Sequence, residues 1–291
     1  MPNSAANSTR RELAELKVQY ELFPDTRDLL VESTRDAWFY RWLLSAIEIP
    51  GVRVYPIDRR VDVPRATVED LGYDWGVRGR LIALSVTADR WSLPGPSVTC
   101  IVDSDFEVVN PSLPHVAALL RTTYPSLESY GLLPGPFAKI ALASGLEIDK
   151  IPGHLGEAMS ALNLLFIARY LLHSARAPVG MVENVHRYLR NVAGHLNVDT
   201  AAIIAKSVQS APTLVQAESV VSSMSAFPRP RPPSLSHVRG HDIPPVLRVL
   251  LGLSGKRADP DTIEESLLMA IEADDMVSDL LAVDLRARLG A

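Results

Sequence analysis

Apolar residues follow two different patterns along this chain, and the pattern changes near residue 135. Before that point, short apolar runs alternate with stretches whose apolar residues recur every three or four positions. Such alternation of strand and helix patterns is typical of an α/β fold with a parallel sheet. After it, helical spacing dominates. We therefore predict a parallel sheet with flanking helices over residues 1–135, followed by a mainly helical half over residues 136–291.

The first half is expected to begin with a strand–helix–strand unit. An apolar run, an amphipathic stretch and a second apolar run follow one another within residues 28–57. This order is the βαβ pattern, whose crossover is right-handed. Ser33 or Thr34 can cap the helix, and Asp36 falls in its first turn. The expected strands are 28–33, 52–57, 81–86 and 98–103, and the expected helices are 10–22, 35–48, 66–71 and 114–121.

The second half is expected to be helical, with one extended interruption. Residues 227–234 (FPRPRPPS) are rich in proline and indicate a stiff, extended connector. Residues 161–172 are the most apolar stretch, but Arg169 interrupts them, so we interpret them as a buried helix. We therefore expect no span of the roughly 18–20 apolar residues that a membrane helix needs. The expected helices are 154–173, 179–193, 199–209, 213–225, 242–252 and 260–288.

Carboxylates follow directly after two of the apolar runs. Glu32 comes after residues 29–31, and Asp103 and Asp105 come after residues 98–102. Ligands bind at the carboxyl ends of strands in open α/β sheets. Three carboxylates in one place repel each other unless a cation lies between them, and their oxygens suit Mg²⁺ or Mn²⁺. An Asp-x-Asp pair alone is more often a turn, but the joint placement predicts a metal site that acts on phosphates.

The overall composition is that of an ordinary globular protein. Hydrophobic residues make up 47% and charged residues 22% of the 291 positions. The single cysteine, Cys100, excludes an intrachain disulfide, and its apolar surroundings favour a buried residue over a reactive thiol. The polar N-terminus has no apolar secretory core, so we expect a cytoplasmic protein.

The net charge of −5 is concentrated at the C-terminus. Residues 255–291 hold nine acidic and four basic side chains, whereas the remainder of the chain is close to neutral. The chain therefore lacks the pervasive positive charge of a nonspecific DNA-binding protein. A local basic groove, or a partner that supplies the basic surface, remains open.

Short motifs resemble those of Toprim domains. VESTRDAWFY (31–40) is similar to the first Toprim motif, and VDSDF (102–106) is similar to the Asp-x-Asp motif of that family. Three further segments resemble one Toprim-like branch, which includes the AriB effector of PARIS anti-phage systems. They are TTYPSLESYGL (122–132), VRGHDIPPVLRVLL (238–251) and the terminal helix 261–285.

The resemblance assigns roles to individual residues. It implies that Glu32 is a metal ligand or general acid/base, that Asp103 and Asp105 bind Mg²⁺, and that Glu128 completes the site. It further implies a Mg²⁺-dependent nuclease that acts on RNA or DNA, with tRNA as one possible substrate, in a bacterial anti-phage defence system. An ABC-type ATPase partner, and a homodimer or an ATPase-bound form, are implied in the same way.

One departure from the Toprim pattern leaves a second function open. Ser33 stands where a Gly usually follows the first Glu. The alternative is a non-catalytic Toprim-like module that docks on an ATPase through its acidic C-terminal segment. A primase or topoisomerase activity has less support, because we find neither a topoisomerase Tyr-bearing domain nor a zinc ribbon, and no P-loop indicates ATP hydrolysis by this chain.

Three other groups of residues have both a structural and a functional interpretation. Asp36 either favours the start of its helix or tunes the metal site. Asp242 either caps a following helix or, with His241, contacts phosphate. His186 and Arg190 would share one face of the expected helix 181–195, as a solvated surface or as a phosphate-binding surface. The structural interpretation is the commoner one for all three.

Overall fold

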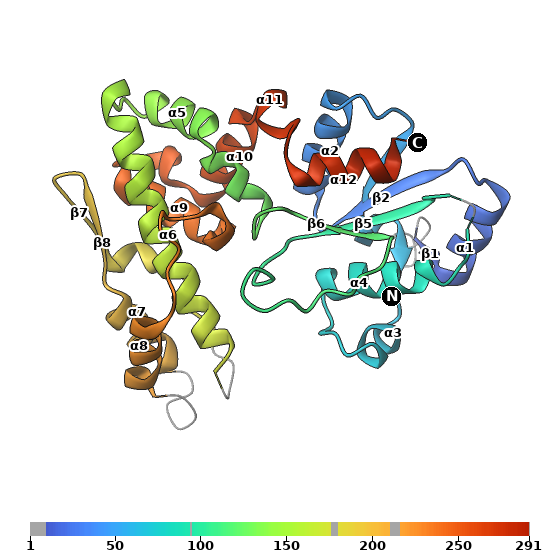
Figure 1. Cartoon of the computed structure of the whole chain (residues 1–291), viewed down its shortest axis with the longest axis horizontal. Coiled ribbons are helices and arrows are strands. Elements are labelled where there is room, and N and C mark those ends of the chain that lie inside the picture. Colours follow the sequence, from blue (N-terminus) through green and yellow to red (C-terminus); the bar gives the residue numbers. More distant parts are fainter. Residues whose placement is uncertain (1–9, 94, 176–179, 210–215, 291) are drawn as a thin grey trace, which may run out of the picture. The chain divides into compact units, whose positions relative to one another are not determined.

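The computed structural model describes residues 10–93, 95–175, 180–209 and 216–290. It has a mixed α/β architecture, with parallel strands flanked by helices (Figure 1). The chain forms two compact units, each discontinuous in sequence. This division differs from the boundary expected at residue 135, because the C-terminal end of the chain belongs with the N-terminal unit. The first unit comprises Met1–Ser104, Pro111–Thr123 and Ala273–Ala291, and the second comprises Asp105–Asn110 and Tyr124–Glu272.

The first unit is built on a four-stranded parallel sheet with the strand order β3-β2-β5-β6. The two central strands, β2 and β5, are almost wholly buried, as expected where helices cover both faces of a parallel sheet. The predicted strands 28–33, 52–57 and 98–103 are confirmed. The strands are β2 (Arg27–Val31), β3 (Val52–Pro56), β5 (Val98–Val102) and β6 (Leu119–Arg121).

Helices lie on both faces of this sheet. In Figure 1, α2 and α12 lie on one face and α4 on the other. A short parallel pair, β1 (Arg11–Glu12) with β4 (Val61–Asp62), adds to the unit. The predicted helices near 10–22, 35–48 and 66–71 are confirmed. The helices are α1 (Leu13–Leu22), α2 (Thr34–Ala46), α3 (Arg65–Asp70), α4 (Val77–Asp89), α11 (Ala273–Met276) and α12 (Leu280–Leu289).

Two of the predictions for this unit are wrong. Residues 81–86 are not a strand but the middle of α4, where four consecutive apolar residues from Leu81 are all buried. A helix buried on several sides loses its amphipathic period and then resembles a buried strand. Residues 114–121 are not a helix, because β6 begins at Leu119 and pairs with β5. A strand this short is defined by its pairing partner rather than by its own sequence.

The second unit packs its helices around one long central helix. The apolar residues of α6 form the centre of the unit's core, so the predicted buried helix at 161–172 is confirmed. Ile148–His173 is also long and apolar enough to cross a membrane, but 56% of its most apolar window is buried inside the structure, as in core helices of globular proteins. The helices are α5 (Pro134–Ala143), α6 (Ile151–His173), α7 (Thr200–Val208), α8 (Ala217–Ala226), α9 (Ile243–Leu250) and α10 (Pro260–Ala270).

A β-hairpin replaces the helix predicted at 179–193. The strands β7 (Leu189–Val192) and β8 (His195–Val198) pair antiparallel. Ala193 and Gly194 both have positive φ, 52° and 88°, as a two-residue type I′ turn requires. His186 and Arg190 therefore share no helical face, and the proposed surface on helix 181–195 is wrong. Residues 176–179 and 210–215, which belong in part to the predicted helices 179–193 and 213–225, lie outside the described residues.

The helix predicted over 260–288 is divided into α10, α11 and α12. Ile271 is extended, with φ −68° and ψ 131°, and ends α10. Asp279 begins α12, where its carboxylate accepts the N–H of Leu281 at 2.9 Å. The hydroxyl of Thr123, just after β6, donates to the same carboxylate at 2.8 Å. Much of the acidic C-terminal segment is therefore part of the first unit's fold.

Candidate active site at the carboxyl edge of the sheet

Glu32 and Asp103 follow the two central strands of the sheet at the same edge. Glu32 comes directly after β2, and Asp103 directly after β5. These strands are hydrogen-bonded neighbours, and their register pairs Leu30 with Cys100. Continued by two residues, this register places Val102 opposite Glu32, one position before Asp103. The structure therefore brings these two predicted residues to one edge, on strands about 4.8 Å apart. Both residues are partly exposed.

The start of α2 defines the backbone immediately after Glu32. The Ser33 hydroxyl accepts the N–H of Asp36 at 3.1 Å, and the Asp36 carboxylate accepts the N–H of Ser33 at 2.8 Å. This reciprocal capping box confirms the predicted cap and gives Asp36 a structural role. Burial raises the pKa of Asp36 although the hydrogen bonds with Ser33 oppose this shift. Ser33 has φ −128°, so this backbone position does not require Gly.

The chain after β5 is held by two neighbouring elements. The guanidinium of Arg78, in the first turn of α4, donates to the carbonyl of Asp103. The N–H of Ser104 donates to the Thr122 hydroxyl at 2.9 Å, just after β6. Arg78 was not among the predicted site residues, because the strand expected at 81–86 hid the helix α4 that carries it. Gly76, which precedes the first turn of α4 and lies two residues before Arg78, was the available signal.

The other two predicted ligands belong to the second unit. Asp105 adopts a positive φ of 45°, a conformation that Asp tolerates better than most residues. Its carboxylate lies 3.5 Å from a nitrogen of Arg239, whose guanidinium also lies over the Phe106 ring, 5.5 Å from its centroid. The N–H of Asp105 donates to the carbonyl of Pro125 at 3.0 Å. Asp105 is thus held beside a cation within its own unit.

Glu128 packs directly against the Gly240 turn of the second unit. Glu128 lies in a 3₁₀ helix, η2 (Leu127–Leu132). A Cβ added at Gly240 would lie 2.3 Å from the Glu128 Oε2 atom, so only glycine allows this approach. The Ser129 hydroxyl also donates to the carbonyl of Val238 at 3.0 Å. Two segments that are far apart in the sequence, 122–132 and 238–251, therefore pack together within the second unit.

Asp242 forms an ion pair with Arg169 and does not act as the predicted helix cap. It precedes α9 but makes no capping hydrogen bond with its side chain. Its carboxylate is fully buried and accepts two hydrogen bonds from Arg169, at 2.6 and 2.7 Å. Arg169 is the residue that interrupts the apolar run of α6. The pair is a structural ion pair, so the capping interpretation of Asp242 is wrong.

The fit of a divalent cation depends on the donors at the sheet edge. Among the residues that the structure describes, no three His, Cys, Asp or Glu side chains form a group that could hold a metal ion. However, Mg²⁺ is commonly bound by only one or two carboxylates, with water and substrate phosphates in its other positions. Glu32 and Asp103 provide such a pair of oxygen donors.

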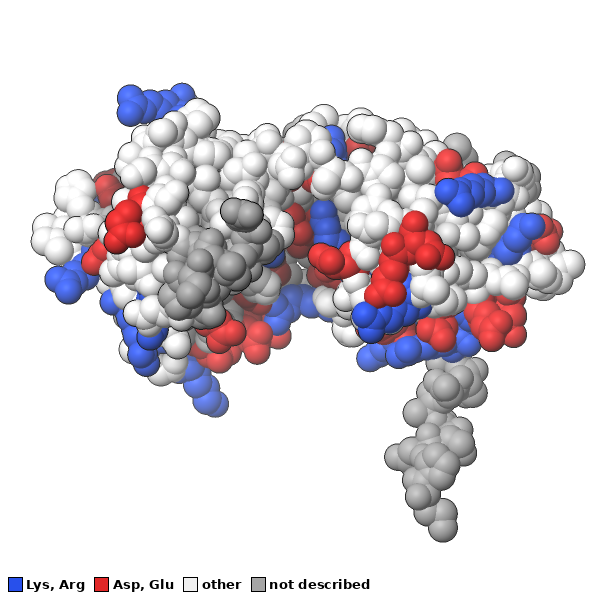
Figure 2. Space-filling view, turned by 90° about the horizontal axis from the view of Figure 1, so that it is seen from below, with Lys and Arg blue, Asp and Glu red and all other residues white. Residues whose placement is uncertain are grey.

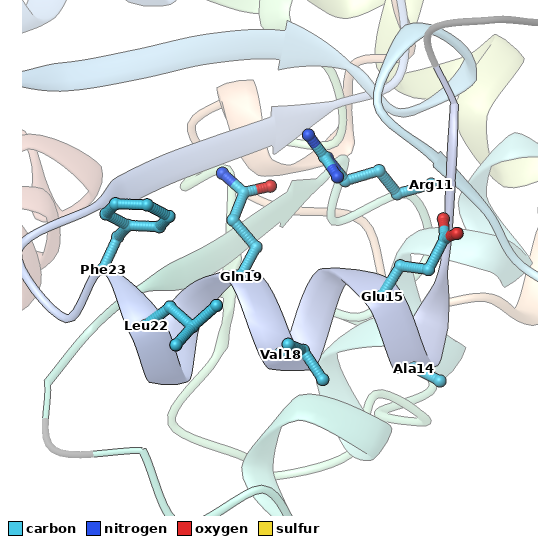
Figure 3. Close-up of a pocket in the computed structure, with 7 residues that line it drawn as sticks. All are labelled: Arg11, Ala14, Glu15, Val18, Gln19, Leu22 and Phe23. Carbon is cyan, nitrogen blue, oxygen red and sulfur yellow. The ribbon is translucent and has the colours of Figure 1, made fainter.

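A separate groove on α1 lacks such chemistry. Its volume is about 460 Å³, and Figure 3 shows the side chains that line it, from α1 and from the residues just before and after this helix. Three of them, Val18, Leu22 and Phe23, are apolar and at least half exposed. On the face seen in Figure 2, acidic and basic side chains are intermixed on each unit, so that face has no broad basic surface.

Comparison with known proteins provides no assignment for this site. No protein-family model and no curated protein matched the chain. The chemistry of the sheet edge is therefore argued from its own residues.

Proposed function

We propose that this protein is a Mg²⁺-dependent nuclease that cleaves phosphodiester bonds of RNA or DNA, with tRNA as the first candidate. We further propose that its first unit is a Toprim-like domain, joined to a mainly helical second unit, and that it acts as an effector in bacterial anti-phage defence. The observation that carries the proposal is the position of Glu32 and Asp103 at the carboxyl ends of adjacent parallel strands.

The residues at this edge have distinct roles in the proposal. Glu32 and Asp103 would hold the cation, which when bound polarises a phosphodiester oxygen and helps generate a hydroxide nucleophile. Arg78 holds the main chain of Asp103 and places a guanidinium, a group that suits phosphate, beside this edge. The first turn of α2 directs its positive dipole end toward the backbone beside Glu32. An anionic substrate is thus favoured at this edge.

Asp105 and Glu128 remain predicted ligands of the metal ion. Asp105 is two residues after Asp103 in the chain, and its carboxylate forms an ion pair with Arg239. Glu128 is confined by its contact with Gly240. Conservative replacement of each residue tests its contribution separately from that of the sheet edge.

The alternative function is a non-catalytic module that docks on an ABC-type ATPase. The feature that favours it is the acidic C-terminal segment, where Glu272, Asp274 and Asp284 are exposed. Because α12 is packed into the first unit through Leu281, Leu285 and Leu289, any docking would use a folded acidic surface rather than a loose tail.

Cleavage and metal binding together distinguish the two functions. The full-length protein is incubated with labelled tRNA, single-stranded RNA and duplex DNA over a range of Mg²⁺ and Mn²⁺ concentrations, with and without a candidate ATPase. Divalent binding is measured by calorimetry. The nuclease proposal predicts metal-dependent cleavage that Glu32→Gln and Asp103→Asn abolish and that the control Glu21→Gln leaves unchanged.

Two other outcomes would count against the nuclease proposal. Cleavage that persists in Glu32→Gln contradicts the proposed site. Absence of both cleavage and divalent binding, together with tight binding to the ATPase, favours the docking module.

A further inference from the structure

A small cavity lies at the amino edge of the first unit's sheet, at the opposite end of β5 from Asp103. Its volume is about 290 Å³. Asp89 contributes to it from the end of α4, Ser97 from the residue before β5, and Arg288 from the last turn of α12. The five residues of β5 separate this cavity from Asp103 by roughly 16 Å of strand. It is therefore distinct from the proposed catalytic edge.

Two hydrogen-bond donors at this cavity have no acceptor among the residues that the structure describes. The Ser97 hydroxyl and the Arg288 Nε atom are both shielded from solvent, and neither makes a hydrogen bond within the described part of the chain. Ser97 is only 1% exposed, and its backbone is fixed because its carbonyl accepts the N–H of Asp28. Unpaired buried donors destabilise a fold by about 1–3 kcal/mol each. Both donors would be satisfied by one ligand group with two acceptor oxygens, such as a carboxylate.

The rest of the cavity does not favour a simple anion. Asp89 lines it, and one oxygen of its carboxylate accepts the N–H of Ala117 at 3.2 Å. Helices α4 and α12 both end here, so their negative dipole ends face the same region. Burial lowers the pKa of Arg288, and the nearby charge of Asp89 partly opposes this shift. A ligand therefore needs a positive group near Asp89 as well as a negative group near Arg288.

We propose that this cavity binds a small zwitterion of the α-amino acid class. Its carboxylate accepts hydrogen bonds from Arg288 and Ser97, and its ammonium group lies against Asp89. Leu93 and Val98, which also line the cavity, leave an apolar surface for a small side chain. The volume is near the lower end of the usual range for ligand pockets, about 300–1,000 Å³, so the ligand is small. Arg288 is only partly buried and can turn its guanidinium toward the ligand.

Equilibrium dialysis with radiolabelled glycine, alanine and valine tests this proposal on the full-length protein. We expect saturable binding of at least one of them at a single site per chain. Acetate has only the carboxylate of the proposed ligand, and methylammonium has only its ammonium group. Each should bind at least about tenfold more weakly, because one charged hydrogen-bonded group is then missing. If none of the three amino acids binds, or if acetate or inorganic phosphate binds as tightly as they do, the zwitterion site is contradicted.

Variants locate the binding site. Arg288→Gln and Asp89→Asn should each weaken binding by about tenfold or more, whereas Arg90→Gln, one residue beyond Asp89 and outside the cavity lining, should not. If Arg288→Gln fails to fold, as judged by circular dichroism, Ser97→Ala provides the same test with a smaller change in shape. Binding that is unchanged in a folded Arg288→Gln or Ser97→Ala protein overturns the proposal. These measurements need no nuclease activity, so their outcome is independent of the proposed function.

Discussion

Two carboxylates at opposite ends of β2, those of Asp28 and Glu32, lie in very different environments. Asp28, near the amino end, is fully buried and is surrounded by partners from three segments. Tyr20 donates to it at 3.0 Å, Arg60 at 2.8 Å and Arg53 at 2.9 Å. Burial, and then the negative charge of Asp28, raises the pKa of Tyr20 far above its usual value. Asp28 therefore belongs to a closed structural network.

Glu32, four residues later, lies in a different environment. It is partly exposed and follows the strand at the edge where ligands bind in open α/β sheets. A buried charge with two arginines is best explained by stability, whereas a carboxylate with access to solvent can meet a ligand. The contrast shows that position along the strand, rather than residue type, decides whether an acid here is enclosed by partners or has access to solvent.

The largest expected effect comes from Asp28→Asn. This change leaves Arg60, which is almost wholly buried, without its full counter-charge. Breaking a buried ion pair on one side costs about 3–5 kcal/mol. Urea unfolding should show a lower free energy of unfolding by that amount, with Asp62→Asn, an exposed acid in β4, as the matched control. A change below about 1 kcal/mol would remove the contrast between the two ends of β2.

Glu32→Gln should lower metal-dependent cleavage strongly and stability only slightly. The free energy of unfolding should change by less than about 0.5 kcal/mol, as for most exposed positions. Metal-dependent cleavage should fall by more than about a hundredfold, since changes beyond the ligands themselves already cost about 10–100-fold. Stability and cleavage are measured on the same preparation. A stability loss equal to that of Asp28→Asn would mean that Glu32 is also structural.

A smaller effect is expected at Gly240 in the second unit. Gly240→Ala introduces a Cβ that would lie 2.3 Å from the carboxylate of Glu128. Such overpacking destabilises by about 1–3 kcal/mol. Gly153→Ala is the matched control, because a Cβ there meets no described atom within 4 Å. Thermal unfolding should therefore separate the two variants, and equal melting temperatures would show that Glu128 moves aside freely.

The smallest expected effect concerns the pH dependence of the second unit. Burial lowers the pKa of His237 from its usual 6.5, so the folded state binds this proton less readily than the unfolded state. The free energy of unfolding should therefore decrease as the pH falls below about 6.5. His237→Gln should reduce this decrease between about pH 7.5 and about pH 5.5. The exposed His115→Gln is the control, and an unchanged slope in His237→Gln would contradict the prediction.

Several elements could be recognised from local patterns. Strands β2 and β5 are largely buried, and each ends in an apolar run, 29–31 and 100–102, that is followed directly by an acid. The start of α2 was recognisable because Ser33 and Asp36 complete a capping box within four residues. In these cases the forces that define the element act between residues close together in the chain.

Other elements depend on partners far away in the chain. The helix α4 was mistaken for a strand because packing on several sides hides its period. The edge strand β6 exists because β5 offers hydrogen bonds, and the hairpin β7–β8 depends on two positive φ angles. Arg169 looked like an interruption, yet it forms an ion pair with Asp242, 73 residues later.

The sequence by itself determined that Glu32 and Asp103 follow apolar strands, because burial and strand ends are local properties. Only the tertiary structure decided that β2 and β5 are neighbours, which places these two acids at one edge. It also decided that Asp28 is neutralised by Arg53 and Arg60 and that α12 belongs to the first unit. These outcomes depend on which distant segments pack together, because hydrogen bonds and charge pairs across strands connect residues that no local pattern relates.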